Sequence, residues 1–245
     1  MSRPLLLLSL AAVLSFAPGA WAQAVDIEKA PVAQVAPSFL RATPLELMKR
    51  LPPAPEAGSL AALADLEAVL QVQAWRTSEQ VAWADVVDKW SALDFAPVLG
   101  PWFTEANLPA TAALMKAATG DLRPVSREIK KHYDRPRPPK VDPRVQPTVP
   151  VPTSGSYPSG HTLHIFVEAG VLAEIYPECR EALMARAHRA AWGRIIGGVH
   201  FPTDVVGGRL LAAMVVADMK QSEAFQKAVA ACRRESEPFL LKKAR

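Results

Sequence analysis

The stretch that decides the fold reads Gly155-Ser156-Tyr157-Pro158-Ser159-Gly160-His161-Thr162 and leads directly into an apolar helical pattern over residues 159–175. Ser159 fits the N-cap position, so the amides of the residues after it are expected to be free donors at the positive end of a helix. Such a helix end can bind an anion, and Gly160 lets an oxyanion approach the backbone closely. The stretch therefore predicts a helix that begins at an anion site, although a Ser-Gly turn often does no more than cap a helix.

Helical patterns also run through most of the remaining chain, and no segment shows the sustained alternation that a strand needs. A short helix is expected between Thr43 and Pro52, and an amphipathic helix capped by Ser59 is expected to reach Trp75. Further helical patterns cover residues 77–90, 108–118, 123–133, 178–197, 202–219 and 222–235. The 23 prolines against 12 glycines also disfavour a chain of long strands, because proline lacks a backbone donor. The prediction is an all-α, single-domain helical bundle over residues 45–245.

The N-terminus has the pattern of a secretory signal peptide. Met1-Ser2-Arg3 precedes an apolar stretch of 13 residues, and Ala20-Trp21-Ala22 has the form of a cleavage site. Because that stretch is shorter than the ~20 residues that span a bilayer, it argues against a membrane anchor. We therefore expect residues 1–22 to be cleaved off, residues 23–44 to be extended, and the mature chain to be periplasmic or secreted without a membrane span. An oxidising compartment would allow a disulfide between Cys179 and Cys232, with two free buried thiols as the alternative.

A run of five basic residues lies within eight positions, Lys130-Lys131-His132-Tyr133-Asp134-Arg135-Pro136-Arg137. Such runs are usually solvated faces, and the formal net charge of +4 suits small anions as well as nucleic acid. The prolines beside Arg135 and Arg137 fix the backbone and so aim these side chains in definite directions. No aromatic platform is interleaved with the cations, so nucleic acid is not an expected partner. Lys130 and Arg137 are the candidates for binding an anion.

The segment after this run, residues 138–158, holds seven prolines in 21 positions. It predicts a polyproline-like loop and no helix. Stiff prolines lower the entropy cost of ordering a loop, so we expect the segment to be pinned over one domain. A flexible linker between two domains is the alternative.

The third cluster is Gly193-Arg194 followed by His200-Phe201-Pro202-Thr203-Asp204. Pro202 is expected in the first turn of a helix, with His200 just before the N-terminal end of that helix and Asp204 about one turn further on. A carboxylate there can accept a hydrogen bond from one imidazole nitrogen, which fixes the tautomer and leaves the other nitrogen as a nucleophile. A histidine and an aspartate four positions apart are also common as a surface pair.

Together, the three clusters supply what phosphoryl transfer needs. The transferring group spreads negative charge over three oxygens, so fixed cations and amides must surround it. Two histidines can divide the chemistry, one attacking phosphorus and the other protonating the leaving oxygen. Because Lys130, Arg137 and Arg194 supply the positive charge, the sequence predicts no metal ion and no cofactor.

Three motifs carry a resemblance to the type 2 phosphatidic acid phosphatase superfamily: Lys130-x6-Arg137-Pro138, Pro158-Ser159-Gly160-His161 and Arg194-x5-His200-x3-Asp204. They match its three-part signature in order and spacing. The octet over residues 155–162 is also similar to the signature of the bacterial class A non-specific acid phosphatases, which are secreted soluble enzymes. Leu51-Pro52-Pro53 and Asp65 are similar to the N-terminal helical region of these enzymes, so the resemblance covers about residues 45–235.

The resemblance implies the all-α fold of acid phosphatases and vanadium haloperoxidases, and hydrolysis of small phosphomonoesters with an acidic optimum. It implies that His200 forms a phosphohistidine, that Asp204 orients His200, and that His161 is the general acid and later the base. The implied phosphate ligands are Lys130, Arg137, Ser159, Gly160 and Arg194. Members of the family often form dimers or larger assemblies, so the resemblance also implies a homo-oligomer.

Gly193 departs from the signature, which has a serine before the arginine. The change removes a hydroxyl that could reach a phosphate oxygen and leaves a backbone amide there. We expect a changed rate or affinity and a retained activity, because the nucleophile, the acid and the cations are all present. The alternatives are an enzyme similar to the vanadium haloperoxidases, which would hold vanadate among the same residue types, and a non-catalytic anion-binding relative.

Overall fold

The computed structural model describes residues 39–243. The expected signal peptide and most of the expected extended segment therefore lie outside the described residues. All regular secondary structure of residues 39–243 is helical, which confirms the all-α prediction. In chain order the elements are α1 (Pro44–Arg50), α2 (Leu60–Trp75), α3 (Ser78–Asp88), η1 (Ala92–Phe95), α4 (Ala96–Leu99), α5 (Pro109–Gly120), α6 (Leu122–Tyr133), α7 (Pro138–Val141), α8 (Gly160–Ile175), η2 (Pro177–Cys179), α9 (Arg180–Ile196), α10 (Pro202–Met219) and α11 (Glu223–Lys243).

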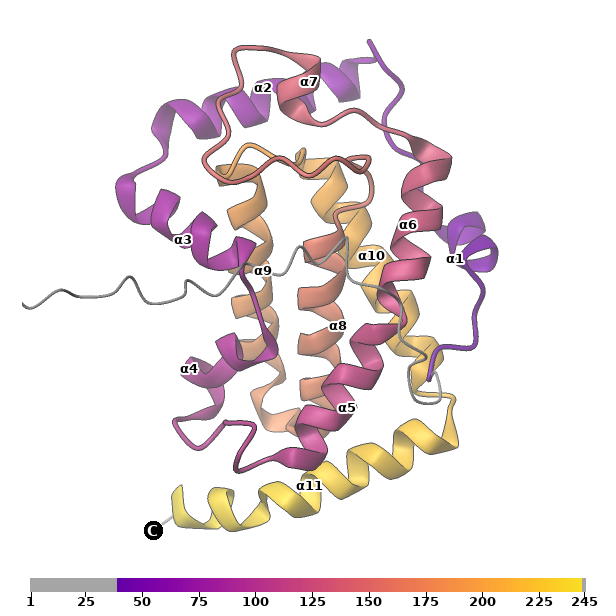
Figure 1. Cartoon of the computed structure of the whole chain (residues 1–245), viewed down its shortest axis with the longest axis vertical. Helices are drawn as coiled ribbons and strands as arrows, with labels where there is room; N and C mark the ends of the chain where they lie inside the picture. The colour runs from indigo at the N-terminus through magenta and orange to yellow at the C-terminus, as the bar shows by residue number, and fades with distance from the viewer. Residues whose placement is uncertain (1–38, 244–245) are drawn as a thin grey trace, which may run out of the picture. The chain divides into compact units, whose positions relative to one another are not determined.

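Helix α8 is the centre of the bundle (Figure 1). It lies between α9 and α10 and also contacts α5, α6 and α11. Nearly every side chain from Thr162 to Ile175 is buried, which is the pattern of a helix enclosed on all sides. The N-terminal end of α8 is thereby held in place by the whole core. None of the described helices is long and apolar enough to span a bilayer.

The sequence explains most helix starts. Thr43 and Thr77 form capping boxes at α1 and α3, and Ser59 and Ser159 cap α2 and α8 through their hydroxyl groups. Proline occupies the first turn of α1, α5, α7 and α10, where a missing N–H costs no hydrogen bond.

Three expectations about the helices need correction. The apolar stripe of α2 is buried only in part, because Val69 is buried and Leu66, Leu70 and Val72 pack against a small core cluster while Leu60 and Leu63 are exposed. The short elements η1 and α4 were not expected from the pattern. Helix α11 extends to Lys243 with Pro238 inside it, beyond the expected end at residue 235.

The proline-rich segment is pinned over the bundle as expected, but it starts with a helical turn. Pro138–Val141 form α7, because two prolines at the start of a helix lose no hydrogen bond. The rest of the segment is irregular and lies over the helix ends, where Thr148 N–H donates to Gly197 O (3.1 Å) and Arg76 Nη2 donates to Gln146 O (2.9 Å). No disulfide joins Cys179 to Cys232 in the structure of residues 39–243, and burial raises the pKa of the Cys232 thiol.

Helix α10 packs closely against the start of α8 and the residues just before it at two glycines. A Cβ on Gly208 would lie 2.5 Å from Ser159 O, and one on Gly207 would lie 2.5 Å from the ring of Tyr157. Because Ser159 is the N-cap of α8, this packing fixes the position of α10 along the axis of α8. The two motifs that end at His161 and Asp204 are therefore held in register by backbone contact.

We expect Gly208→Ala to destabilise the fold by about 1–3 kcal/mol, because the new methyl group meets backbone that cannot rotate away. Unfolding in denaturant, followed by circular dichroism, measures the loss. Ala213→Leu is the control, since Ala213 is exposed on the same helix. Equal stability of Gly208→Ala and the wild type would contradict the close packing of α8 and α10.

Candidate active site

The imidazole of His200 is paired with the carboxylate of Asp204 in the interior of the protein. His200 Nδ1 lies 3.2 Å from Asp204 Oδ2, and the two side chains are 1% and 0% exposed. The short turn before α10 depends on Gly198, whose φ of +71° is one that L side chains rarely adopt. The expected pair of His200 and Asp204 therefore exists. It is buried, whereas an ordinary surface pair would be exposed.

Arg137 lies on the other side of the His200 ring. Its Nη1 is 3.1 Å from His200 Nε2, and its remaining contacts include Val199 O and Ser154 O. A guanidinium has only donors, so Nε2 is the accepting nitrogen and the ring is neutral. Nδ1 then carries the proton and donates it to Asp204, which leaves the lone pair of Nε2 on the side of the cations.

Lys130 approaches the same place from the end of α6. Its Nζ donates to Gly155 O (2.6 Å), and its Cε lies 3.7 Å from where a Cβ on Gly160 would be. Asp134 is the C-cap of α6, and with a φ of +41° it turns the chain so that Arg137 follows Lys130 into the site. Asp is among the residues that tolerate this conformation.

Arg194 and His161 meet at the end of α3. Arg194 Nη1 donates to Asp88 Oδ1 (2.8 Å), and His161 Nε2 donates to Asp88 O (3.2 Å). Among the described residues, Arg194 Nε and Nη2 have no protein partner although the side chain is 0% exposed. A buried guanidinium with two such donors fits an oxyanion. His161 is only half-buried, so it lies at the accessible side of the cluster.

Ser159 and Gly160 begin α8 next to these groups. The Ser159 hydroxyl accepts from Thr162 N (3.4 Å) and Thr162 Oγ1 (3.0 Å), so its own proton remains for another acceptor. Ser159 N–H donates to Asp204 O (2.9 Å), which links the start of α8 to the first turn of α10. The structure thus brings all of the predicted site residues to one place.

Burial and the neighbouring cations keep both histidines neutral. The pKa of His200 lies well below its ordinary value, first because of burial and then because of Arg137 and Lys130. The pKa of His161 is also well below its ordinary value, owing to burial and then to Arg194. A bound anion would offset the positive charge and raise both pKa values. The site without an anion therefore favours neutral imidazoles. Protonation of His161 depends on an anion bound to the neighbouring cations.

Gly193 has a packing explanation. A Cβ at this position would lie 3.0 Å from Val87 Cγ2, so α3 lies against α9 where the signature serine would project. Gly193 is within α9, where the amides are engaged along the helix, so it does not offer the free amide that the sequence suggested. The missing hydroxyl is therefore coupled to a close approach of α3, the helix that ends at Asp88.

Four polar residues at the site were not among the predicted site residues: Asp65, Asp88, Arg135 and Ser156. Ser156 Oγ donates to Asp204 Oδ2 (2.5 Å) and Arg135 Nη1 donates to Asp204 Oδ1 (2.6 Å). Arg135 belongs to the basic run, and Ser156 belongs to the octet that begins at Gly155. Nothing in the spacing of Asp88 singles it out, because only the folded chain brings α3 to Arg194.

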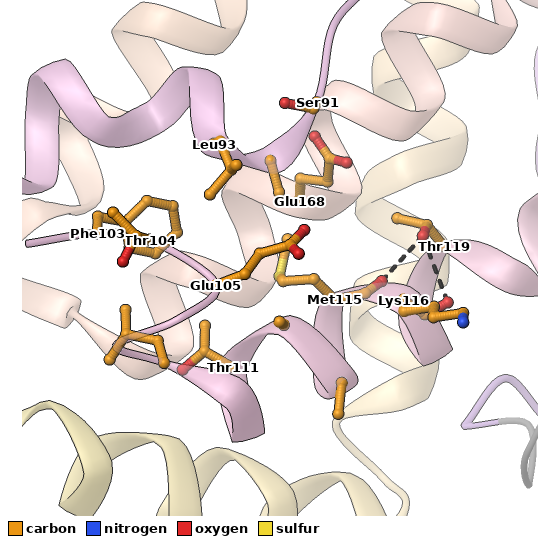
Figure 2. Close-up of a pocket in the computed structure, with 14 residues that line it drawn as sticks. Ser91, Leu93, Phe103, Thr104, Glu105, Thr111, Met115, Lys116, Thr119 and Glu168 are labelled. Atoms are coloured by element: carbon orange, nitrogen blue, oxygen red, sulfur yellow. Dashed lines mark hydrogen bonds between the residues drawn. The ribbon is translucent and has the colours of Figure 1, made fainter. Parts of the chain in front are cut away.

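A separate pocket of about 410 Å³ lies between α5, the segments around Ser91 and Phe103, and the middle of α8. Figure 2 shows Glu105, Met115 and Glu168 near the middle of this pocket. Trp90 Nε1 donates to Glu168 Oε2 (3.0 Å), and burial raises the pKa of Glu168 to about 8. None of the predicted site residues lines this pocket.

Comparison with known proteins agrees with the all-α fold. The model of the PAP2 superfamily matches residues 107–226, the part of the chain that contains all of the predicted site residues. Solved structures of this fold include a PAP2-type phosphatidylglycerolphosphate phosphatase from Bacillus subtilis (TM-score 0.53, 19% identity, 73% of this chain and 90% of that chain). A bacterial vanadium-dependent chloroperoxidase is also similar (TM-score 0.64, 15% identity), with 81% of this chain covering 55% of that longer chain.

Sequence relatives narrow the class further. A non-specific acid phosphatase from Providencia stuartii is 30% identical over 75% of this chain and 77% of its own length. Another from Salmonella typhimurium is 33% identical over 62% of this chain and 63% of its own length. The chain therefore belongs to the family of the non-specific acid phosphatases, and its residues 107–226 match the PAP2 superfamily.

Anion binding should be coupled to proton uptake at the two histidines. Sulfate stays a dianion throughout the experiment, so its affinity should rise as the pH falls, by up to about tenfold per pH unit and proton taken up. Calorimetric titration between about pH 5 and pH 8 measures this, with His132→Ala as a control at an exposed histidine. His161→Ala should flatten the dependence. An affinity for sulfate that does not change with pH would contradict the electrostatic coupling.

Restoring the signature serine should depend on Val87. We expect Gly193→Ser alone to lower the thermal midpoint, because its Cβ meets Val87 Cγ2 at 3.0 Å. Adding Val87→Ala should recover the midpoint and lower the KM for a phosphomonoester, since the hydroxyl then has room. Thermal unfolding and steady-state kinetics of the two variants and of Val87→Ala alone decide this. A single Gly193→Ser variant as stable as the wild type would refute the packing explanation.

Proposed function

We propose that the protein is an exported acid phosphatase that hydrolyses phosphomonoesters in two steps through a phosphohistidine on His200, without a metal ion. The family supplies the acid phosphatase activity. The observation that carries the mechanism is the neutral His200 ring, whose Nδ1 is held by Asp204 while Nε2 lies among buried cations. Such a nitrogen is a prepared nucleophile next to a site for an oxyanion.

In the first step, the lone pair of His200 Nε2 attacks phosphorus and the bond to the leaving oxygen breaks. The substrate phosphate would lie against Lys130, Arg137 and the Nε and Nη2 donors of Arg194. Its remaining partners would be the Ser159 hydroxyl and the first amides of α8, whose donors do not need to reorganise during the reaction. The positive charge that develops on His200 is stabilised by Asp204 through Nδ1–H.

His161 supplies the proton for the leaving oxygen. Its Nε2–H is engaged with Asp88 O, so Nδ1 is the nitrogen that gains and loses a proton. In the second step His161 takes a proton from water, the oxygen of that water attacks phosphorus, and the bond from phosphorus to Nε2 breaks. Phosphate leaves and both histidines return to their starting states.

The protonation states that the mechanism needs at the two histidines predict higher activity at acidic pH. His161 must be protonated to act first, and its pKa is depressed by burial and Arg194 until an anionic substrate is bound. His200 must be neutral, and its pKa is depressed by burial and Arg137. Activity should therefore rise as the pH falls, until His200 itself takes up a proton.

Export and self-association belong to the same proposal. The N-terminal pattern of residues 1–22 supports a periplasmic or secreted enzyme with cleavage after Ala22. By analogy with members of the family, the protein would assemble into a dimer or larger homo-oligomer. Size-exclusion chromatography with light scattering measures the oligomeric state. The substrates would be small phosphomonoesters.

A vanadate-dependent peroxidase is the second candidate, because its fold is shared and vanadate resembles phosphate in the transition state. Halide oxidation by the vanadate-loaded protein measures that activity. A non-catalytic anion-binding relative would show neither activity.

We expect hydrolysis of p-nitrophenyl phosphate at about pH 5–6 to survive excess EDTA and to fall at least about 10³-fold in His200→Ala, because the nucleophile is removed. Vanadate should inhibit competitively. Rapid quench at alkaline pH followed by mass spectrometry should find phosphate on His200 in the wild type. His188→Ala is the matched control, since His188 is exposed on α9 and packs against Phe166. Full loss of activity with EDTA, or unchanged activity in His200→Ala, would overturn the mechanism.

A further inference from the structure

Arg135 connects two buried carboxylates that come from different helices. Its Nη1 lies 2.6 Å from Asp204 Oδ1, and its Nη2 lies 2.7 Å from Asp65 Oδ2. The exposed fractions of Arg135, Asp65 and Asp204 are 8%, 4% and 0%. Taking three charges out of water is costly unless each is paired, so this arrangement is under strong geometric constraint.

Arg135 holds Asp204 from both sides. The guanidinium reaches Oδ1 directly, while the backbone carbonyl of Arg135 accepts from Ser156 N (2.7 Å). Ser156 in turn donates its hydroxyl to Asp204 Oδ2 (2.5 Å), the oxygen that faces His200. The guanidinium also stacks 4.2 Å from the centre of the Phe201 ring, the residue after His200. One residue thus fixes the carboxylate and the chain on which the nucleophile is carried.

Asp65 fixes Arg135 and the start of α10 together. Its Oδ1 accepts from Thr203 N (3.2 Å), an amide in the first turn of α10, and its Oδ2 accepts from the hydroxyl of Thr203. A carboxylate at the start of a helix is favourable, because the free amides point at it. These contacts explain why the buried side of α2 carries a carboxylate at position 65, where an apolar side chain would otherwise be expected.

The donors of Arg135 are turned away from the anion site. Nη1 is engaged by Asp204 and by Thr203 Oγ1 (2.7 Å), and Nη2 is engaged by Asp65. Arg194, in contrast, has two buried donors without a protein partner. Of the arginines near His200, Arg135 is the one built into the support of Asp204.

We propose that Arg135, anchored by Asp65, is a positioning residue that fixes the carboxylate of Asp204 and through it the neutral tautomer of His200. The proposal rests on the phosphohistidine mechanism proposed above, and deepens it. It assigns Arg135 no contact with the phosphate. It also makes Asp65, which lies 135 positions before His200 in the chain, a part of the support of the nucleophile.

The charges around His200 give the proposal a signature that depends on pH. The groups that face or influence the ring are Arg137, Lys130, Arg194, Arg135, Asp204 and His161. Removing the positive charge of Arg135 should make an imidazolium easier to form. Removing the negative charge of Asp65 leaves the charge of Arg135 less compensated and should make an imidazolium harder to form.

The test compares Arg135→Gln, Arg135→Lys and Asp65→Asn with the wild type. Histidine labelled with ¹⁵N reports the tautomer and the titration of His200, which is assigned by its absence in His200→Ala. Steady-state kinetics with p-nitrophenyl phosphate give kcat and KM across the pH range. Lys131→Gln is the matched control, because it removes an exposed cation from the same basic run.

We expect Arg135→Gln to lower kcat by about 10- to 100-fold, with KM within about threefold of the wild type, because the nucleophile is misplaced while the phosphate ligands remain. The titration of His200 and the acidic limb of the pH profile should move up by about one pH unit, and Asp65→Asn should move both down. Arg135→Lys keeps the charge, so the limb should stay in place while kcat falls. Lys131→Gln should behave as the wild type.

Circular dichroism and thermal unfolding establish which variants are folded. If Arg135→Gln does not fold, Asp65→Asn decides the question, because it is nearly isosteric and leaves Arg135 in place. A folded Arg135→Gln variant with reduced kcat but an unmoved His200 titration would reduce Arg135 to a structural role and overturn the proposal. A rise in KM alone would make Arg135 a phosphate ligand, which also overturns it. If the wild type hydrolyses no phosphomonoester, the proposed function fails, and the ¹⁵N signals still decide whether Arg135 and Asp65 fix the tautomer of His200.

Discussion

Four donors converge on the buried carboxylate of Asp204, and the arrangement of the site depends on them. His200 Nδ1 and Ser156 Oγ contact Oδ2, Arg135 contacts Oδ1, and Phe201 N donates to Oδ2 (2.8 Å). A carboxylate with no exposed surface needs this many partners, because an unpaired buried charge is strongly unfavourable. The donors come from the turn before α10, from the segment after α6 and from the proline-rich segment. Satisfying one side chain therefore ties together the parts of the chain that carry the chemistry.

The same site concentrates positive charge where water is scarce. Lys130, Arg137 and Arg194 are 6%, 2% and 0% exposed, and their partners include backbone carbonyls and Asp88. Among the described residues, Arg194 Nε and Nη2 have no protein partner. Burial first, and then the nearby cations, lower the pKa of both histidines, and a bound phosphate group would offset the positive charge. Affinity for the substrate and readiness of the acid thus have a common electrostatic origin.

Much of this arrangement could be predicted from the sequence. Short-range rules located the caps at Thr43, Ser59 and Ser159, and motif spacing located the residues that meet at the start of α8. The exceptions have one cause. Asp65 was part of an expected amphipathic helix, yet it is buried because its carboxylate pairs with Arg135, a partner 70 positions away. Local patterns carry no information about such partners.

The departure at Gly193 shows how a site and its packing are linked. A serine at this position would need space that Val87 of α3 occupies. The same helix ends at Asp88, whose carboxylate holds Arg194 and whose carbonyl holds His161. Bringing α3 close to α9 therefore leaves no room for a serine hydroxyl at position 193 but places Asp88 against Arg194 and His161. In the proposed mechanism, the orientation of a cation and of the general acid takes the place of one hydrogen bond to the substrate.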